Sequence, residues 1–136
     1  MTYKLGTRSK NNLKGVHPDL VKVVEKAIGL TTQDFTVIEG VRTTKRQQEL
    51  YAQGRTAPGN IVTNVDGVKK KSNHQAKADH YGHAVDIIPY PVDWDSISKF
   101  DNIAVAMKLA ACELGVDIVW GGDWENFKDY PHFELG

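Results

Sequence analysis

Hydrophobic residues recur at helical spacing in two parts of the chain. After His17 and Pro18 they stand at positions 20, 23, 24, 27 and 28, the i, i+3, i+4, i+7, i+8 pattern of a helix with one buried face. Proline suits the first turn of a helix, so the pattern predicts a helix that begins at Pro18 and ends at Gly29. A second pattern predicts a helix over residues 103–114, with Gly115 as its cap.

Short runs of β-branched and aromatic residues predict strands between and after these helices. The runs cover residues 35–39, 84–88, 116–120 and 132–135. Thr44 and Gln47 have the spacing of a capping box, which predicts a further helix from Thr44 to about Gly54.

Residues 54–78 have no periodicity and are rich in Gly, Asn, Pro, Lys and Ser, which indicates a long loop that is functional or mobile. Helices and strands occur in blocks rather than in strict alternation. The pattern therefore predicts an α+β fold: one small domain over residues 1–136, with a largely antiparallel sheet flanked by helices.

Composition narrows the classes of function. A chain of 136 residues suits one core, and 17 basic against 17 acidic residues give no net field towards nucleic acid or an anionic membrane. The basic run at residues 69–71 is typical of a solvated loop. Neither an apolar leader nor a stretch near the ~20 apolar residues of a membrane span is seen. Cys112 is the only cysteine, so no intrachain disulfide forms, and its apolar neighbours predict a buried thiol. We expect a monomer that neither binds nucleic acid nor inserts into a membrane.

Potential metal ligands gather in the second half of the chain. They are His74, His80, His83 and Asp86, followed by His132 in the last predicted strand beside Asp129 and Glu134. Zn²⁺ accepts neutral imidazole and carboxylate, and a catalytic site uses three such ligands and leaves one position open. Without a fixed spacing such as His-Glu-x-x-His, the cluster alone is more typical of surface or hydrogen-bonded histidines.

Several separated motifs resemble one family of zinc peptidases. The motifs are Ser72-Asn73-His74, Gly82-His83-Ala84-Val85-Asp86 and Asp129-Tyr130-Pro131-His132, joined by His17-Pro18-Asp19-Leu20, Val37 to Thr43 and Trp120 to Trp124. In this order they are similar to the M15 peptidases, which include D-Ala-D-Ala carboxypeptidases and small phage L-alanyl-D-glutamate endopeptidases. The similarity extends over nearly the whole chain and implies the D-Ala-D-Ala peptidase or hedgehog-like fold.

The resemblance implies a role for each matching residue. A histidine, Asp86 and His132 would bind Zn²⁺, and Asp129 would take a proton from the metal-bound water and return it to the leaving amine. Arg42 would bind a substrate carboxylate or stabilise the oxyanion, and Ser72 would hydrogen-bond the substrate. Each residue also has a simpler interpretation. Asp86 suits a core carboxylate paired with Arg42, Arg42 a structural ion-pair partner, and Asp129 a turn residue.

The first histidine ligand departs from the family pattern, in which it precedes the glycine by three residues. Here position 79 is Asp, while His80 lies two residues before Gly82 and His74 eight. We favour His74 over His80 because Ser72-x-His74 keeps the serine in register, with residues 75–80 as an inserted excursion. Strand alternation sends His83 to the face opposite Asp86.

The resulting hypothesis is a phage endolysin that cuts the L-Ala to D-Glu bond of the peptidoglycan stem peptide, with no separate wall-binding domain. Made without a signal peptide in the bacterial cytoplasm, it would reach the wall after another protein disrupts the membrane. Two alternatives stay open: a D-Ala-D-Ala carboxypeptidase of the same family, and a zinc-stabilised binding module without catalysis.

Overall fold

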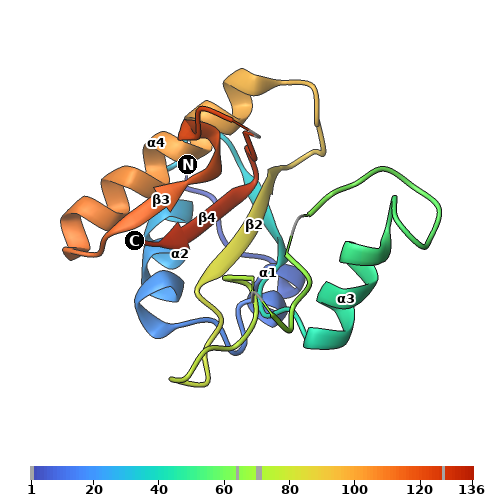
Figure 1. Ribbon diagram of the computed structural model, residues 1–136. Helices are drawn as coiled ribbons and strands as arrows, with labels where there is room; N and C mark the ends of the chain where they lie inside the picture. Colours follow the sequence, from blue (N-terminus) through green and yellow to red (C-terminus); the bar gives the residue numbers. More distant parts are fainter. Residues whose placement is uncertain (1, 64, 70–71, 127) are drawn as a thin grey trace.

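A four-stranded sheet forms the centre of the computed structural model, which describes residues 2–63, 65–69, 72–126 and 128–136 (Figure 1). Its strands are β1 (Phe35–Glu39), β2 (Ala84–Pro89), β3 (Ile118–Trp120) and β4 (His132–Leu135). They lie in the order β1-β2-β4-β3, and each neighbouring pair is antiparallel. The predicted α+β class with an antiparallel sheet is confirmed.

Two helices cover one face of this sheet. α2 (Pro18–Leu30) and α4 (Ile97–Leu114) pack against each other behind the strands, as Figure 1 shows. The core between the layers is formed by side chains that are at most 1% exposed, among them Leu20, Val85, Ile87, Met107 and Phe133. Because side chains alternate along a strand, the residues next to Val85 and Phe133 project from the opposite face.

The remaining helices lie around the sheet. α3 (Thr44–Ala52) stands apart from the α2–α4 layer, α1 (Thr7–Asn12) packs on β1, and a 3₁₀ turn, η1 (Gly121–Asp123), follows β3 (Figure 1). No helix in the described part of the chain is long and apolar enough to cross a membrane. Of the predicted basic run, residues 70 and 71 lie outside the described residues.

α1 was not predicted, because its residues are mostly polar and lack a hydrophobic period. In the fold, α1 provides hydrogen-bond partners for the edge strand β1. The Ser9 hydroxyl accepts a hydrogen bond from the Val37 amide at 3.0 Å, and the Asn12 amide donates to the Val37 carbonyl at 2.8 Å. Side chains thus take the place of a neighbouring strand at a sheet edge.

Some predicted boundaries are wrong. α2 continues through Gly29 to Leu30, and α4 begins at Ile97 rather than at 103, because Phe100 adds one more buried anchor. The cap of α3 is Thr43, whose hydroxyl accepts from the Arg46 amide at 3.1 Å, and not Thr44. The αL cap at Gly115 is confirmed by its φ of 68°.

Cys112 is exposed, so the prediction of a buried thiol is also wrong. Ala110 and Ala111 face the core. The next residue is rotated by about 100° around a helix of 3.6 residues per turn and leaves the buried face.

A register shift in β1 aligns polar residues of three neighbouring strands. The pairing of β1 with β2 shifts between Val37 and Glu39, which brings Glu39 opposite Asp86. On its other side Asp86 pairs with His132 of β4. Three polar residues therefore form a row across three strands, on the face that the helices leave uncovered.

Candidate metal centre

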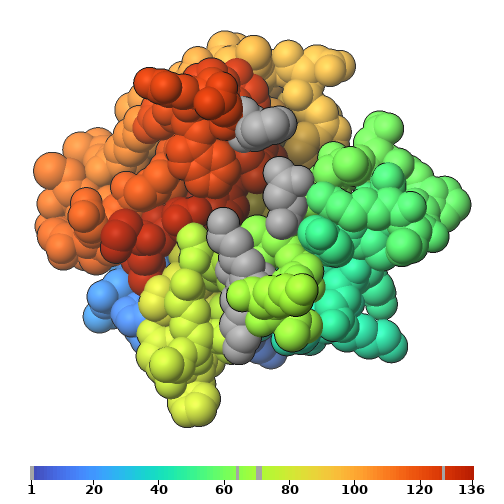
Figure 2. Space-filling model, in the orientation of Figure 1, coloured from blue at the N-terminus to red at the C-terminus, as the bar shows by residue number. Residues whose placement is uncertain are grey.

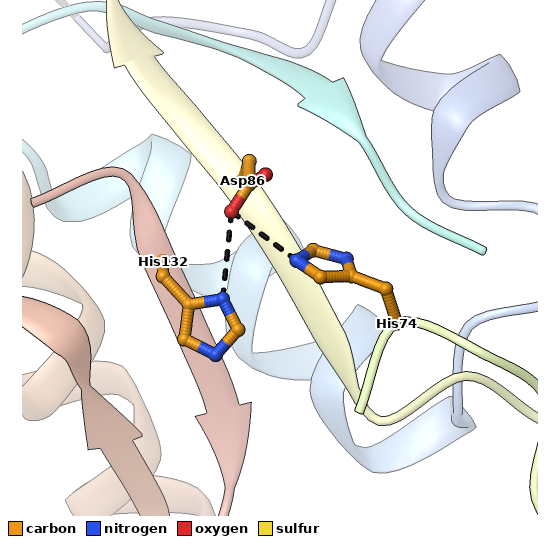
Figure 3. A group of neighbouring side chains, drawn as sticks. All are labelled: His74, Asp86 and His132. Atoms are coloured by element: carbon orange, nitrogen blue, oxygen red, sulfur yellow. Dashed lines mark ion pairs between the residues drawn. The ribbon is translucent and has the colours of Figure 1, made fainter. Parts of the chain in front are cut away.

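Three potential ligands converge on this uncovered face: His74 from the long loop, Asp86 from β2 and His132 from β4 (Figure 3). Asp86 Oδ1 lies 3.3 Å from His74 Nε2 and 3.5 Å from His132 Nδ1. One ligand atom from each of the three residues lies within 4.8 Å of the others. The spacing is that of a set able to close around one cation after small side-chain shifts.

His74 is oriented by the chain that passes behind it. Its Nδ1 lies 3.0 Å from the Gly40 carbonyl oxygen, and a carbonyl only accepts, so Nδ1 carries the proton and the Nε2 lone pair faces Asp86. A side chain at Gly40 would overlap the carbonyl of Asn12. Glycine therefore allows the strand end to pass α1 closely enough to reach the imidazole.

His132 is oriented through its other nitrogen. Its Nε2 lies 2.7 Å from Glu134 Oε1, and the second oxygen of Glu134 accepts from the Asn73 side-chain amide at 2.7 Å. An ionised carboxylate only accepts, so Nε2 carries a proton and Nδ1 is directed to Asp86. The two imidazoles thus approach Asp86 through different ring nitrogens, as Figure 3 shows.

The surroundings of the Asp86 carboxylate indicate a cation site. Its Oδ1 is buried and, although both imidazoles are in contact with it, accepts no hydrogen bond from the described residues. A buried carboxylate oxygen without a donor is costly unless an ion or a donor compensates it. Two imidazoles and one carboxylate are also the donor set of many catalytic metal sites. The residues present therefore fit a bound metal.

The electrostatics of the metal-free group agree with this interpretation. Burial opposes ionisation of Asp86, but the neighbouring imidazoles outweigh it and lower its pKa. Burial also lowers the pKa of His132, but the adjacent Asp86 carboxylate and the contact with Glu134 outweigh it and raise this pKa to about 9. Without a metal, the His132 proton provides the positive charge that Asp86 requires.

Arg42 is held tightly beside the site. Its Nε and Nη2 donate to the two oxygens of Glu39, both at 2.8 Å, and Nη1 donates to Gln47 at 2.8 Å. Nη2 lies 3.8 Å from Asp86 Oδ2, an ion pair longer than a hydrogen bond. Burial lowers the pKa of Arg42, but Glu39 more than compensates and raises it. Arg42 therefore pairs mainly with Glu39. It donates no hydrogen bond to Oδ1 of Asp86.

Asp129 begins the turn that leads into β4. Its carbonyl accepts from the His132 amide at 3.1 Å, and its amide donates to Gly121 at 3.0 Å. A side chain at Gly121 would overlap the Asp129 carbonyl, so glycine permits this close approach. The side chain is exposed, yet partial desolvation and the nearby Asp86 carboxylate raise the pKa of Asp129. Asp129 is therefore both a turn residue and a carboxylate near the ligand group.

Ser72 lies at the start of the loop segment that carries His74. Its hydroxyl accepts from the His74 amide at 3.2 Å, and its own amide donates to Gln75 at 2.9 Å. The hydroxyl proton is not used by these contacts. Ser72 orders the loop and retains one donor.

The other histidines of the cluster lie elsewhere. His83 Nε2 is 2.7 Å from Asp79 Oδ2, and its ring packs against that of His17. His80 is exposed and has a φ of 69°. Within the described ranges, only His74 joins Asp86 and His132 in a possible metal group.

Glu134 was noted beside His132 in the sequence, but the other residues that hold this group were missed. Gly40 contacts His74, Glu39 and Gln47 hold Arg42, and Asn73 holds Glu134. Glu39 and Gly40 do lie in the Val37 to Thr43 motif, which was a usable signal. Asn73 lies in the Ser72-Asn73-His74 motif, but nothing in the sequence indicated its contact with Glu134, 61 positions away. Gln47 was assigned only to a capping box, and its contact with Arg42 was not predicted.

The three tryptophans differ in their surroundings. Trp120 is 6% exposed and stacks on Phe133, whereas Trp94 is 57% exposed. Trp124 lies beside the site, with its ring centroid 5.3 Å from that of His132. Trp120 therefore belongs to the core, Trp124 borders the ligand group, and Trp94 does not belong to the core.

Comparison with known proteins places this geometry in a family. The profile of the phage L-alanyl-D-glutamate peptidases matches residues 1–135. The chain belongs to this family. It is 32% identical over 138 residues to the L-alanyl-D-glutamate peptidase of Escherichia phage T5, covering 99% of this chain and 90% of that protein.

Further relatives agree with the assignment. The chain is 37% identical over 110 residues to the peptidoglycan L-alanyl-D-glutamate endopeptidase CwlK of Bacillus subtilis, covering 75% of this chain and 60% of that protein. The crystal structure of the Serratia marcescens L-Ala D-Glu endopeptidase ChiX superposes with a TM-score of 0.76 and 36% identity, over 99% of this chain and 91% of that one.

A more distant likeness concerns the fold alone. The vancomycin-resistance D,D-dipeptidase VanXYg, solved with a D-Ala-D-Ala phosphinate analogue, has a TM-score of 0.55 at 16% identity, over 88% of this chain and 50% of that one. The expected D-Ala-D-Ala peptidase fold is thereby confirmed. The family match and the His-Asp-His group together identify this chain as a member of a peptidase family.

Proposed function

We propose that this protein is a zinc-dependent peptidoglycan peptidase that hydrolyses the L-Ala to D-Glu bond of the stem peptide. The observation that carries the proposal is the buried Asp86 Oδ1, which lacks a hydrogen-bond donor between two oriented imidazoles. It occurs in a chain that matches a peptidase family over residues 1–135. The named activity of its relatives supplies the scissile bond.

Zinc is the proposed metal, bound by His74 Nε2, Asp86 Oδ1 and His132 Nδ1. Imidazole and carboxylate suit Zn²⁺, and three protein ligands leave a position for water or substrate. When bound, zinc supplies polarisation of the scissile carbonyl and lowers the pKa of water towards ~7.

Asp129 is the proposed general base and acid. A carboxylate whose pKa is raised accepts a proton more readily than an ordinary one and returns it to a leaving amine. Desolvation and the Asp86 charge provide this increase in basicity. Its exposed position leaves the carboxylate open to substrate.

Arg42 and Ser72 are the proposed substrate-binding residues. Glu39 and Gln47 occupy N–H groups on all three guanidinium nitrogens, so Arg42 acts mainly as a fixed positive charge towards developing negative charge. Ser72 keeps its hydroxyl proton for a substrate carbonyl. Peptidoglycan would enter on the face shown in Figure 2, which is bordered by α3, the segment around residues 75–82 and the C-terminal segment.

Product analysis and one substitution test the activity. We expect mass spectrometry of digested peptidoglycan to detect new L-Ala carboxyl ends. Asp129→Asn keeps a residue suited to the turn, and we expect it to lower the rate about 10²- to 10⁴-fold while zinc and fold are retained. Asp123→Asn, at an exposed carboxylate paired with Lys108, is the matched control and should remain active.

Each other outcome has a definite meaning. Loss of terminal D-Ala would identify a carboxypeptidase, and zinc binding without any cleavage would identify a binding module. Full activity of Asp129→Asn would reject Asp129 as the base.

Two histidine substitutions test the ligand assignment. We expect His74→Ala to lose stoichiometric zinc, as measured by elemental analysis after dialysis, because Nε2 is one of three ligand atoms. His80→Ala should retain zinc, since its side chain is exposed outside the group. The reverse pattern would transfer the ligand role to His80.

A further inference from the structure

We infer that Asn73 and Glu134 form a positioning pair that selects the ring nitrogen through which His132 binds the metal. The pair also ties the loop of His74 to strand β4. This inference rests on the proposed zinc site and concerns two residues that do not touch the metal.

The contacts form a chain of two short hydrogen bonds. Asn73 Nδ2 donates to Glu134 Oε2 at 2.7 Å, and Glu134 Oε1 lies 2.7 Å from His132 Nε2. The side chain of Glu134 is only 17% exposed, so water competes weakly for its oxygens. Both carboxylate oxygens are therefore directed by protein groups.

The chemistry of the pair fixes the tautomer. Asn73 provides an N–H to one oxygen of Glu134, and His132 provides Nε2–H to the other, which keeps the Nδ1 lone pair for a metal. A carboxylate behind a ligating imidazole also increases its basicity and limits its rotation. Without Glu134, the proton of neutral His132 would be free to move to Nδ1 and block the ligand atom.

The pair also sets the distance between two ligands. Asn73 directly precedes His74, and Glu134 lies two residues after His132 on the same face of β4. The Asn73 carbonyl accepts from the His83 amide at 2.7 Å, which joins the loop to the chain entering β2. A single asparagine thus connects all three segments that carry the ligands.

Zinc binding to the purified, metal-free full chain tests the inference. Affinity is measured by competition with a chromophoric chelator, with zinc as the only ligand, for the wild type and for Asn73→Ala, Glu134→Gln and Glu134→Ala. Glu25→Ala and Asn11→Ala are the controls, because both residues are exposed and lie on α2 and α1.

We expect Glu134→Ala and Asn73→Ala to weaken zinc binding about 10- to 100-fold, the range seen when partners of metal ligands are removed. Glu134→Gln retains an acceptor for Nε2–H and should recover most of the loss. If both residues act through the His132 ring, the variant that combines Asn73→Ala with Glu134→Ala should bind zinc no more weakly than Glu134→Ala alone.

A spectroscopic measurement separates positioning from general destabilisation. In the zinc-loaded wild type, ¹⁵N NMR of the imidazoles should show His132 with a protonated Nε2 and a metal-bound Nδ1. Loss of the slowly exchanging Nε2 proton is expected in Glu134→Ala. Should this variant fail to fold, Asn73→Ala and Glu134→Gln still decide the question.

Two results would overturn the inference. Zinc affinities of Asn73→Ala and Glu134→Ala within twofold of the wild type would reject the positioning role and leave the proposed function intact. Absence of zinc binding by the wild type itself would reject the proposed zinc site and this inference together.

Discussion

At His132, a proton and the proposed metal compete for the same ring nitrogen. Burial alone would lower its pKa, but Asp86 and Glu134 raise it to about 9, above the ordinary value of 6.5. The metal-free protein therefore holds a proton on this ring at neutral pH. The stabilisation this proton gives to the metal-free fold is present below pH 6.5 and is lost as the pH rises through about 9.

Zinc binding should consequently depend on pH. Because the metal must displace the proton of His132, we expect the apparent affinity to increase about tenfold per pH unit between pH 7 and 8.5. Calorimetry in buffers of different ionisation enthalpy should detect release of about one proton per zinc at pH 7.5. Asp86 does not contribute in this range, since its pKa is lowered. A pH-independent affinity would contradict the proton on His132.

Helix α3 and the long loop after it form one structural unit. Gln47 is fully buried and joins them, because its amide donates to Val65 at 2.7 Å and to Thr63 at 3.2 Å. The buried Gln75 makes a second junction through Gly67 and Thr44. Two glutamines thus hold much of a segment whose composition predicted a functional or mobile loop.

Gln47→Ala should loosen this unit. The substitution leaves buried donors and acceptors without partners, so we expect the free energy of unfolding to decrease by about 1–3 kcal/mol. Hydrogen exchange should become faster across residues 65–69, and catalytic activity should decrease because Arg42 loses one of its contacts. The neighbouring Gln48→Ala, at an exposed position of the same helix, is the matched control. Equal stability of the two variants would show that the buried contacts contribute little.

In the whole molecule, the ligand group joins the loop of His74, which contributes no described residue to the hydrophobic core, to strands β2 and β4. The α2–α4 layer packs on one face of the sheet, while the ligands project from the other face and join β2, β4 and the loop. A metal bound there would hold the uncovered face together as the helices hold the covered one.

Metal removal should therefore lower stability. Zinc at a thousandfold excess over its dissociation constant adds about 4 kcal/mol, provided that it binds only the folded state. We expect chelation to lower the melting temperature of the wild type and of His80→Ala. Calorimetric scans of Asp86→Ala, with and without chelator, should coincide because the ligand set is incomplete. A wild type unaffected by chelation would contradict a zinc contribution to the fold.

The sequence by itself determined most elements and the chemical character of the site. Hydrophobic spacing predicted α2, because burial of one helix face requires that period, and runs of β-branched and aromatic residues predicted the strands. Order and spacing of motifs also brought out His74, Asp86, His132 and Asp129. The sequence did not predict α1, which packs on β1 and makes two side-chain hydrogen bonds to it, and the predicted start of α4 was six residues late.

Only the tertiary structure decided how the site residues are held. The bulge in β1, which brings Glu39 opposite Asp86, depends on strand register and leaves no signal in one sequence. The contacts of Asn73 with Glu134 and of Gly40 with His74 join residues 61 and 34 positions apart. A pattern along the chain records which side chains are buried, but the orientation of an imidazole depends on the partners that folding brings to its second nitrogen.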